Sequence, residues 1–181
     1  LVGSEMCIRD SYMRVDTKPQ QEFPDPTPLT DYKLGDKAMG YLQKMTDLCK
    51  EKGVKLVLIK APTEYPYWYE QWDEQVQQFA DENDVDYINF IPLQNDIGLD
   101  MSQDTYDAGL HLNTTGAEKM ADYFGKYLVE NYNLTDYRND SEYASIWDKK
   151  EAAYDSMKQQ QYDELNKYGE LKSFGANAIQ N

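Results

Sequence analysis

The sequence predicts an α/β fold built on parallel strands, and three consecutive segments support that prediction. Residues 54–59 form a short run rich in β-branched side chains, which is typical of a buried strand. Apolar side chains then recur at helical spacing from Trp68 to Ala80, with Pro66 near the start. Residues 86–90 are typical of a second strand. Strand, helix and strand with short connections predict one βαβ unit with parallel strands and a right-handed crossover.

A further helix is expected before this unit. Apolar side chains lie at helical spacing from Leu34 to Cys49, and Asp31 is a residue type favoured at helix N-caps. Gly53 stands where a left-handed C-cap would need a glycine. Cys49 is then expected to be a small buried apolar residue on this helix rather than a nucleophile.

A long loop is expected after the second strand. It covers residues 91–113, and loops of this length without structure of their own are often functional. Thr114 or Thr115 is expected to cap the helix that follows. Residues 134–181 are expected to form a charged helical tail, with one or two amphipathic helices between residues 139 and 168.

Two N-terminal segments are not expected to belong to the domain. Residues 1–11 read L-V-G-S-E-M-C-I-R-D-S, which resembles a translated sequencing-adapter artefact and lacks the basic start and apolar core of a signal peptide. Residues 12–29 are rich in proline and are expected to form a linker or loop. Because only two strands are predicted, and a parallel pair normally belongs to a larger sheet, we expect further strands upstream.

The composition excludes several classes of function. The net charge of −15 argues against nucleic acid or an anionic membrane surface as partner. No run approaches eighteen apolar residues, so no membrane span is predicted. Two cysteines exclude a disulfide-rich scaffold and a four-cysteine zinc site. The single histidine means that any imidazole chemistry must use it.

That histidine, His111, lies in the long loop with carboxylates upstream and a helix start just after. A histidine that acts as a general base needs a hydrogen-bonded acceptor to set its tautomer, and this acceptor is usually a carboxylate. Asp107 lies four residues before His111 with Gly109 between them, so a turn can bring the two together. Two other interpretations fit the spacing: a surface histidine near a capped helix, and a metal site that uses Asp104, Asp107 and His111.

The run D-A-G-L-H-L-N-T-T-G-A-E-K-M at residues 107–120 resembles the last conserved block of SGNH (GDSL-type) hydrolases. In that block an Asp and a His precede "L-N" and "G-A" at a helix start. The run looks most like the bacterial cell-surface branch related to the D-alanyl transfer protein of lipoteichoic acid synthesis. The order of elements between Leu29 and Tyr132 also fits. The resemblance implies a partial three-layer α/β/α, flavodoxin-like fold, with residues 30–133 as the C-terminal half of the domain.

The same resemblance implies a serine esterase or acyltransferase that acts on O-acyl groups of glycans or cell-envelope polymers, without metal or cofactor. His111 would be the base of the triad and Asp107 its orienting acid. Family members commonly place the acid three residues before the histidine, where this chain has Ala108, so Asp104 stays open as the acid. The G-D-S-like nucleophile block and the oxyanion donors are not found here and are expected upstream, so the chain alone is expected to be inactive.

Lys60 ends the first predicted strand, at the edge where open α/β sheets bind ligands. It is interpreted either as a contact to an anionic cell-wall substrate or as a solvated lysine. The resemblance implies an extracellular or cell-surface protein, attached to a membrane only through an N-terminal anchor that this chain lacks. The alternative function is a non-catalytic cell-surface or interaction protein on the same scaffold.

Overall fold

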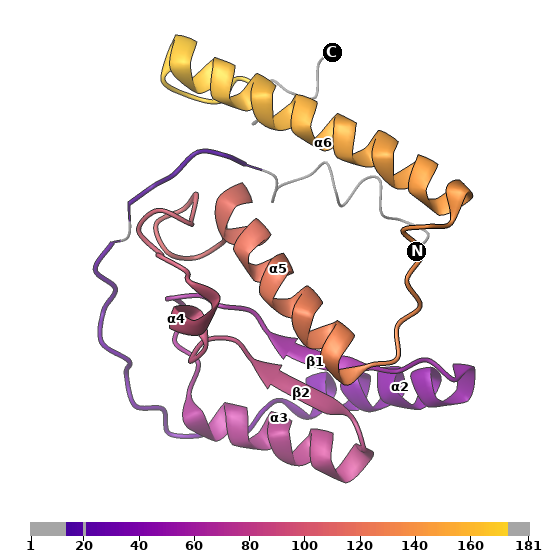
Figure 1. Cartoon of the computed structure of the whole chain (residues 1–181). Helices are drawn as coiled ribbons and strands as arrows, with labels where there is room; N and C mark the ends of the chain where they lie inside the picture. The colour runs from indigo at the N-terminus through magenta and orange to yellow at the C-terminus, as the bar shows by residue number, and fades with distance from the viewer. Residues whose placement is uncertain (1–13, 20, 174–181) are drawn as a thin grey trace. The chain divides into compact units, whose positions relative to one another are not determined.

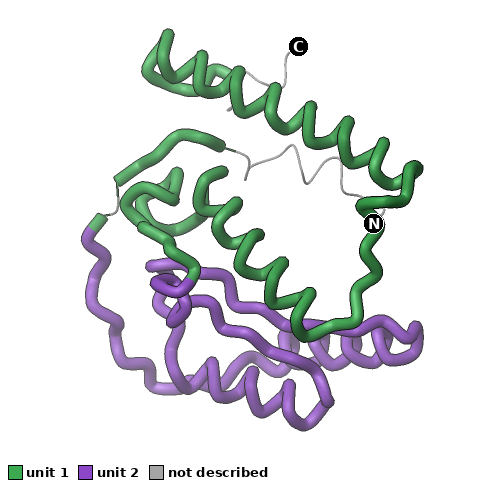
Figure 2. Tube along the Cα trace, viewed as in Figure 1, with its two compact units in different colours: residues 1–21, 97–181 green, residues 22–96 purple. Residues whose placement is uncertain are grey.

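The computed structural model describes residues 14–19 and 21–173, in which helices α2 to α6 accompany strands β1 and β2 (Figure 1). The predicted adapter segment, residues 1–11, lies outside the described residues. Contacts divide the chain into two compact units, which Figure 2 colours separately. One contains residues 1–21 and 97–181, and the other contains residues 22–96.

The unit of residues 22–96 contains the sheet. Strand β1 (Val57–Lys60) and strand β2 (Asp86–Asn89) pair in parallel, with Ile59 opposite Ile88. Helix α3 (Glu70–Asn83) connects them and packs against β2. This arrangement confirms the predicted parallel βαβ unit and the α/β class.

Helix α2 (Asp36–Lys52) precedes the sheet, and its start corrects the predicted cap. Gly35 occupies the N-cap position, while Asp31 instead accepts a hydrogen bond from the backbone N of Lys33 at 2.8 Å. Asp31 therefore stabilises a local turn before the helix, a conformation that competes with capping. Gly53 ends the helix at φ 64, as predicted, and Cys49 is half-buried.

Helix α3 also starts later than its aromatic pattern suggested. Its N-cap is Tyr69, so Trp68 lies outside the helix, where its ring still contacts Trp72 edge-on at 5.6 Å between centroids. Phe79 and Ala80 are the buried residues of α3. The aromatic spacing therefore reflects the packing of Trp68 on Trp72, although the helical conformation begins at Glu70.

The other unit contains the long loop from residue 97 onward and the helix after it. The loop includes a one-turn helix α4 (Gln94–Ile97), whose last residue belongs to this unit, and an antiparallel bridge between Thr105 and Leu112. Helix α5 (Thr114–Asn131) follows. Its N-cap is neither predicted threonine but Asn113, whose side chain accepts a hydrogen bond from the backbone N of Gly116 at 3.0 Å.

A single helix, α6 (Ser141–Tyr168), fills the region where one or two were expected. Asp140 caps its start, and Gly169 ends it at φ 73. Gln161 on α6 is buried and accepts a hydrogen bond from the backbone N of Val15 at 3.0 Å, which ties the helix to the N-terminal segment of the same unit. Among the described helices, none combines the length and apolarity needed to cross a membrane.

Candidate acid–base site

The loop that carries the histidine is closed at its base by backbone pairing. The bridge between Thr105 and Leu112 is followed by a hydrogen bond from the backbone N of Tyr106 to the carbonyl of His111, at 3.2 Å. Ala108 and Gly109 occupy the left-handed region, at φ 69 and φ 104, and they reverse the chain between the two sides. Because left-handed backbone is strained for a residue with a Cβ, Ala108 at this place is held by its surroundings.

The turn lets both carboxylate oxygens of Asp107 form hydrogen bonds with His111. Oδ2 of Asp107 lies 2.5 Å from Nδ1 of His111, and Oδ1 accepts the backbone N–H of the same residue at 2.6 Å. The side chains are 27% and 53% exposed, so the pair sits at the surface of its unit. An acceptor at Nδ1 favours the imidazole tautomer with its proton on Nδ1, which places the lone pair on Nε2. A histidine in this state can act as a general base.

The imidazole also stacks on an aromatic ring. The rings of Tyr106 and His111 are 5.9 Å apart between centroids and within 13° of parallel. The guanidinium carbon of Arg14 lies 5.0 Å from the Tyr106 ring centroid, and Asp16 holds Arg14 through hydrogen bonds of 2.9 and 2.6 Å. The bond to Asp16 raises the pKa of Arg14. No sequence signal pointed to Arg14, which lies far from the loop along the chain, or to Tyr106 within the loop.

The alternative acid, Asp104, faces a different partner. Its side chain is only 2% exposed, and its Oδ2 lies 2.7 Å from Nζ of Lys119 on α5. The same oxygen accepts the backbone N–H of Asp100 at 2.8 Å. The structure therefore brings Asp107, and not Asp104, onto Nδ1 of His111. In the described part of the chain, no three His, Cys, Asp or Glu side chains gather as a metal site would require.

Asn113 fastens the loop to the rest of its unit. Its side chain is buried, and its Nδ2 donates to the carbonyl oxygens of Gln103 at 2.8 Å and Asp16 at 3.3 Å and to Oγ1 of Thr17 at 3.2 Å. Its Oδ1 caps α5 at the same time. The Asn of the "L-N" pair therefore has a positioning role that the sequence motif alone did not reveal.

Gly116 allows close approach of α5 to the loop. A Cβ at this position would lie 2.4 Å from the carbonyl oxygen of Asp104, a distance that no side chain tolerates without a backbone shift. The glycine of the motif is therefore required by packing. Together with Asn113 it sets where the loop leaves the helix start.

Lys60 belongs to the unit of residues 22–96, whereas the dyad, which is the pair of Asp107 and His111, belongs to the other unit. It is the last residue of β1 and half-buried, and burial lowers its pKa. Its Nζ lies 5.4 Å from the ring centroid of Trp68 and 3.3 Å from the carbonyl oxygen of Ala61. Lys60 is thus in contact with an aromatic ring at the carboxyl end of a strand.

A polar cluster that the sequence did not reveal lies in the same unit. Oδ1 of Asp73 accepts hydrogen bonds from Nε1 of Trp68 at 2.9 Å, the hydroxyl of Tyr87 at 2.6 Å and Nδ2 of Asn89 at 2.9 Å. Burial and the bond to Asp73 raise the pKa of Tyr87. This network joins α3 to β2.

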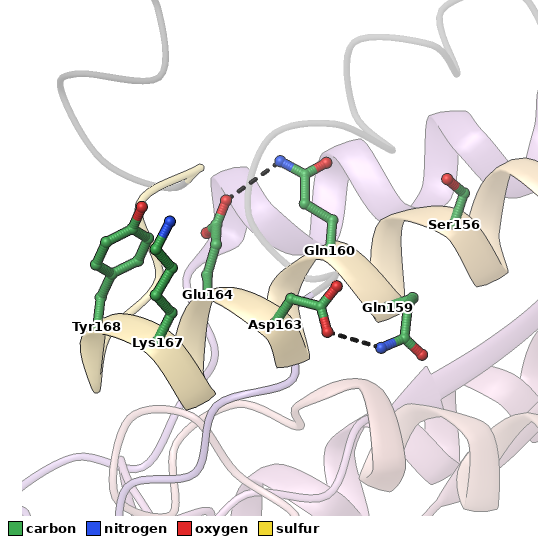
Figure 3. A pocket seen from close by; sticks show the side chains of 7 residues that line it. All are labelled: Ser156, Gln159, Gln160, Asp163, Glu164, Lys167 and Tyr168. Carbon is green, nitrogen blue, oxygen red and sulfur yellow. Dashed lines mark hydrogen bonds between the residues drawn. The ribbon is translucent and has the colours of Figure 1, made fainter.

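One surface depression in the described part of the chain lies on α6, away from Asp107 and His111 in the sequence. All its lining residues come from α6, where Gln159 donates to Asp163 at 2.9 Å and Gln160 donates to Glu164 at 3.2 Å (Figure 3). A depression formed by the side chains of one helix is an open polar surface rather than an enclosed cleft. We therefore assign it no part in the chemistry of His111.

Comparisons of the chain with protein-family models, curated proteins and solved structures found no significant match. The functional interpretation therefore depends on the geometry of the dyad loop and on the resemblance of residues 107–120 to the SGNH block.

Proposed function

We propose that this chain carries the acid–base part of a serine esterase or acyltransferase of SGNH type. The contact between Asp107 and Nδ1 of His111 at 2.5 Å supports the proposal most directly. The proposal includes the finer fold, in which β1 and β2 are two strands of a three-layer, flavodoxin-like sheet. The substrates are O-acyl groups of glycans or cell-envelope polymers, and Lys60 contacts an anionic part of such a polymer.

In the proposed reaction, Nε2 of His111 takes the proton of a serine hydroxyl as the serine oxygen attacks the acyl carbonyl. The imidazolium then gives this proton to the departing alcohol oxygen, and the acyl group remains on the serine. A water molecule or acceptor hydroxyl, deprotonated by the same nitrogen, then attacks the carbonyl carbon of the acyl-serine. As the bond between this carbon and the serine oxygen breaks, the imidazolium returns the proton to the serine oxygen, which frees the acyl product and restores the serine hydroxyl. Asp107 stabilises the imidazolium in both steps. The serine and the oxyanion donors come from sequence upstream of this chain in the parent protein, which is extracellular or cell-surface.

Ester hydrolysis by the parent protein, with p-nitrophenyl acetate as substrate, tests the proposal. We expect His111→Ala and Asp107→Ala each to lower kcat by about 10²–10⁴-fold, because base catalysis and its orientation are lost. Asp122→Ala is the matched control, since Asp122 is an exposed carboxylate on α5 that pairs with Lys126. It should leave the rate unchanged.

Two outcomes would contradict the proposal. Hydrolysis that survives His111→Ala would remove the histidine from the mechanism. Complete absence of activity in a folded parent protein, towards p-nitrophenyl acetate and acetylated glycans alike, would favour the non-catalytic cell-surface alternative. We also expect the 181-residue chain alone to show negligible turnover, and robust turnover would reveal an overlooked nucleophile within it.

A further inference from the structure

Tyr106 lies opposite His111 across the base of the loop. The bridge between Thr105 and Leu112 is antiparallel, so Tyr106 and His111 form the next pair inward, and the hydrogen bond between their backbones agrees with this register. Opposed residues of an antiparallel pair direct their side chains to the same face. The backbone of the loop therefore brings the phenol ring and the imidazole together, and the two rings are stacked.

The contact with Asp107 fixes only one edge of the imidazole. Oδ2 of Asp107 meets the ring at Nδ1, and a contact at one ring atom still allows the ring plane to turn. The χ2 torsion of a histidine has broad minima, so the side chain adds little restraint of its own. The side chain of His111 is also 53% exposed. A flat ring within 13° of parallel, as Tyr106 provides, restricts this rotation.

Arg14 holds the ring of Tyr106 in turn. Its guanidinium carbon lies 5.0 Å from the ring centroid, within the range of a cation–π attraction. Asp16 fixes the guanidinium through two hydrogen bonds, and the carbonyl of Arg14 accepts the backbone N–H of Thr114 at 2.7 Å. Arg14 is therefore anchored at both its backbone and its side chain, and this makes it a fixed support for Tyr106.

We propose that Tyr106 is a positioning residue for His111 and that Arg14 supports it. Asp107 sets which nitrogen of the imidazole carries the proton, and Tyr106 sets the plane in which the ring presents Nε2. The face of the phenol ring does the positioning, so phenylalanine should replace Tyr106 and leucine should not. The consequence for catalysis rests on the proposed function, whereas the orientation of the imidazole does not.

NMR of the 181-residue chain tests the orientation directly. In the unaltered chain we expect a nuclear Overhauser effect between the ring protons of Tyr106 and those of His111. In Tyr106→Leu the ratio of Nδ1-protonated to Nε2-protonated neutral imidazole should fall about two- to tenfold, which is the equilibrium change that the energy of one stacked aromatic pair allows. Tyr106→Phe should keep the ratio of the unaltered chain.

Two matched controls separate this effect from the general loss of a tyrosine or an arginine. Tyr41→Leu removes an exposed tyrosine that also has a lysine, Lys44, over its ring, and it should leave the ratio unchanged. Arg14→Met should lower the ratio in the same direction as Tyr106→Leu. Arg138→Met should not, although Arg138 also binds an aspartate two residues away.

The parent protein gives a second measurement, with p-nitrophenyl acetate as substrate. Tyr106→Leu should lower kcat about tenfold and change KM by less than about twofold, because a misoriented base slows the chemical step rather than binding. Tyr106→Phe should retain kcat within about twofold. A parent protein without activity, combined with the expected change in the tautomer ratio, would contradict the proposed function and support the positioning of His111.

Three results would overturn the positioning role. The first is the absence of the Overhauser effect in the unaltered chain, which needs no variant to fold. The second is an unchanged tautomer ratio in a folded Tyr106→Leu variant. The third is an equal loss in Tyr106→Phe and Tyr106→Leu, since the hydroxyl rather than the ring face would then be responsible. An unchanged ratio in Arg14→Met would overturn the supporting role of Arg14.

Discussion

Asp107 binds His111 twice, through the ring nitrogen and through the backbone N–H of the same residue. The side chain and the peptide group are therefore oriented by one carboxylate. The spacing of four residues works because Ala108 and Gly109 both adopt left-handed backbone and shorten the path between the partners. A spacing of three, common in the SGNH family, is thus not required for this contact.

The tautomer of the imidazole is a direct test of this pair. We expect His111 to carry its neutral-form proton on Nδ1, because that nitrogen faces Oδ2 of Asp107. Asp107→Ala should move the population towards the Nε2-protonated form, which exposed histidines prefer. Nitrogen-15 NMR of the neutral imidazole reads both tautomers, and the single histidine makes the assignment unambiguous. An unchanged tautomer in Asp107→Ala would show that another group orients the ring.

The buried carboxylate of Asp104 depends on Lys119 for its charge partner. Lys119→Ala should lower the free energy of unfolding by about 2 kcal/mol, because an ionised carboxylate is left in a site that is 2% exposed. Lys126→Ala removes an exposed partner of Asp122 on the same helix and should cost less than about 0.5 kcal/mol. Urea unfolding of both variants gives the comparison, and equal losses would contradict the assigned burial effect.

The start of α5 is the element that holds the dyad loop in place. Asn113 caps the helix with one side-chain atom and binds the loop and the N-terminal segment with the other. Gly116 brings the helix axis close to the carbonyl of Asp104. Helix capping and loop position are therefore coupled, so a substitution that disrupts either should alter the position of His111.

Alanine substitutions at two glycines on α5 distinguish the effect of close packing from the effect of helix propensity. Gly116→Ala should lower the free energy of unfolding by about 2 kcal/mol, because its Cβ would overlap the Asp104 carbonyl at 2.4 Å. Gly125→Ala on the same helix meets nothing within 4 Å and should stabilise the protein by about 0.5–1 kcal/mol. Thermal or urea unfolding measures both. A stable Gly116→Ala variant with an unchanged histidine NMR spectrum would contradict the close approach.

At the scale of the whole molecule, contacts within one unit tie α6 to α5. Glu118 on α5 accepts hydrogen bonds from the hydroxyl of Tyr154 at 2.8 Å and from Nζ of Lys158 at 2.6 Å. Burial raises the pKa of Tyr154, and its bond to Glu118 raises it further. Burial raises the pKa of Glu118, but the hydrogen bonds from Lys158 and Tyr154 lower it by more, so this pKa lies below its usual value.

These shifts predict a limited pH range for the α5–α6 contact. The lowered pKa of Glu118 stabilises the folded state above the ordinary Glu value of about 4.3, and this contribution is lost as pH falls below it. The raised pKa of Tyr154 stabilises the folded state below about pH 10, and this contribution is lost at higher pH. Each effect should be under about 1 kcal/mol, because Glu118 is 45% exposed and its charges are screened by solvent.

Unfolding measured from about pH 3 to pH 11 tests this range. Glu118→Gln should flatten the acid limb and Tyr154→Phe the alkaline limb, while Asp148→Asn, which alters an exposed carboxylate on α6, should flatten neither. If Glu118→Gln and Tyr154→Phe keep the pH profile of the unaltered chain, the contact does not contribute to stability.

Periodicity predicted most elements because it reports which faces are buried. Both strands, the helix between them and the C-cap at Gly53 were predicted from local patterns alone. Helix starts were less predictable. Asp31 has the right chemistry for a cap but is used in a turn, and Gly35 begins the helix without a side-chain cap. Near α5, three consecutive residues are of types that cap helices, and the one used is Asn113, whose type ranks above Thr at an N-cap.

The sequence by itself determined the α/β class, the βαβ unit and the placing of the lone histidine in a loop before a helix. Only the tertiary structure decided that Asp107, rather than Asp104, contacts His111, and that Asn113 binds the N-terminal segment. The physical reason is distance along the chain. Lys119 pairs with Asp104, and Asn113 binds partners as far as 97 residues away along the chain. Neither contact leaves a local pattern in the sequence.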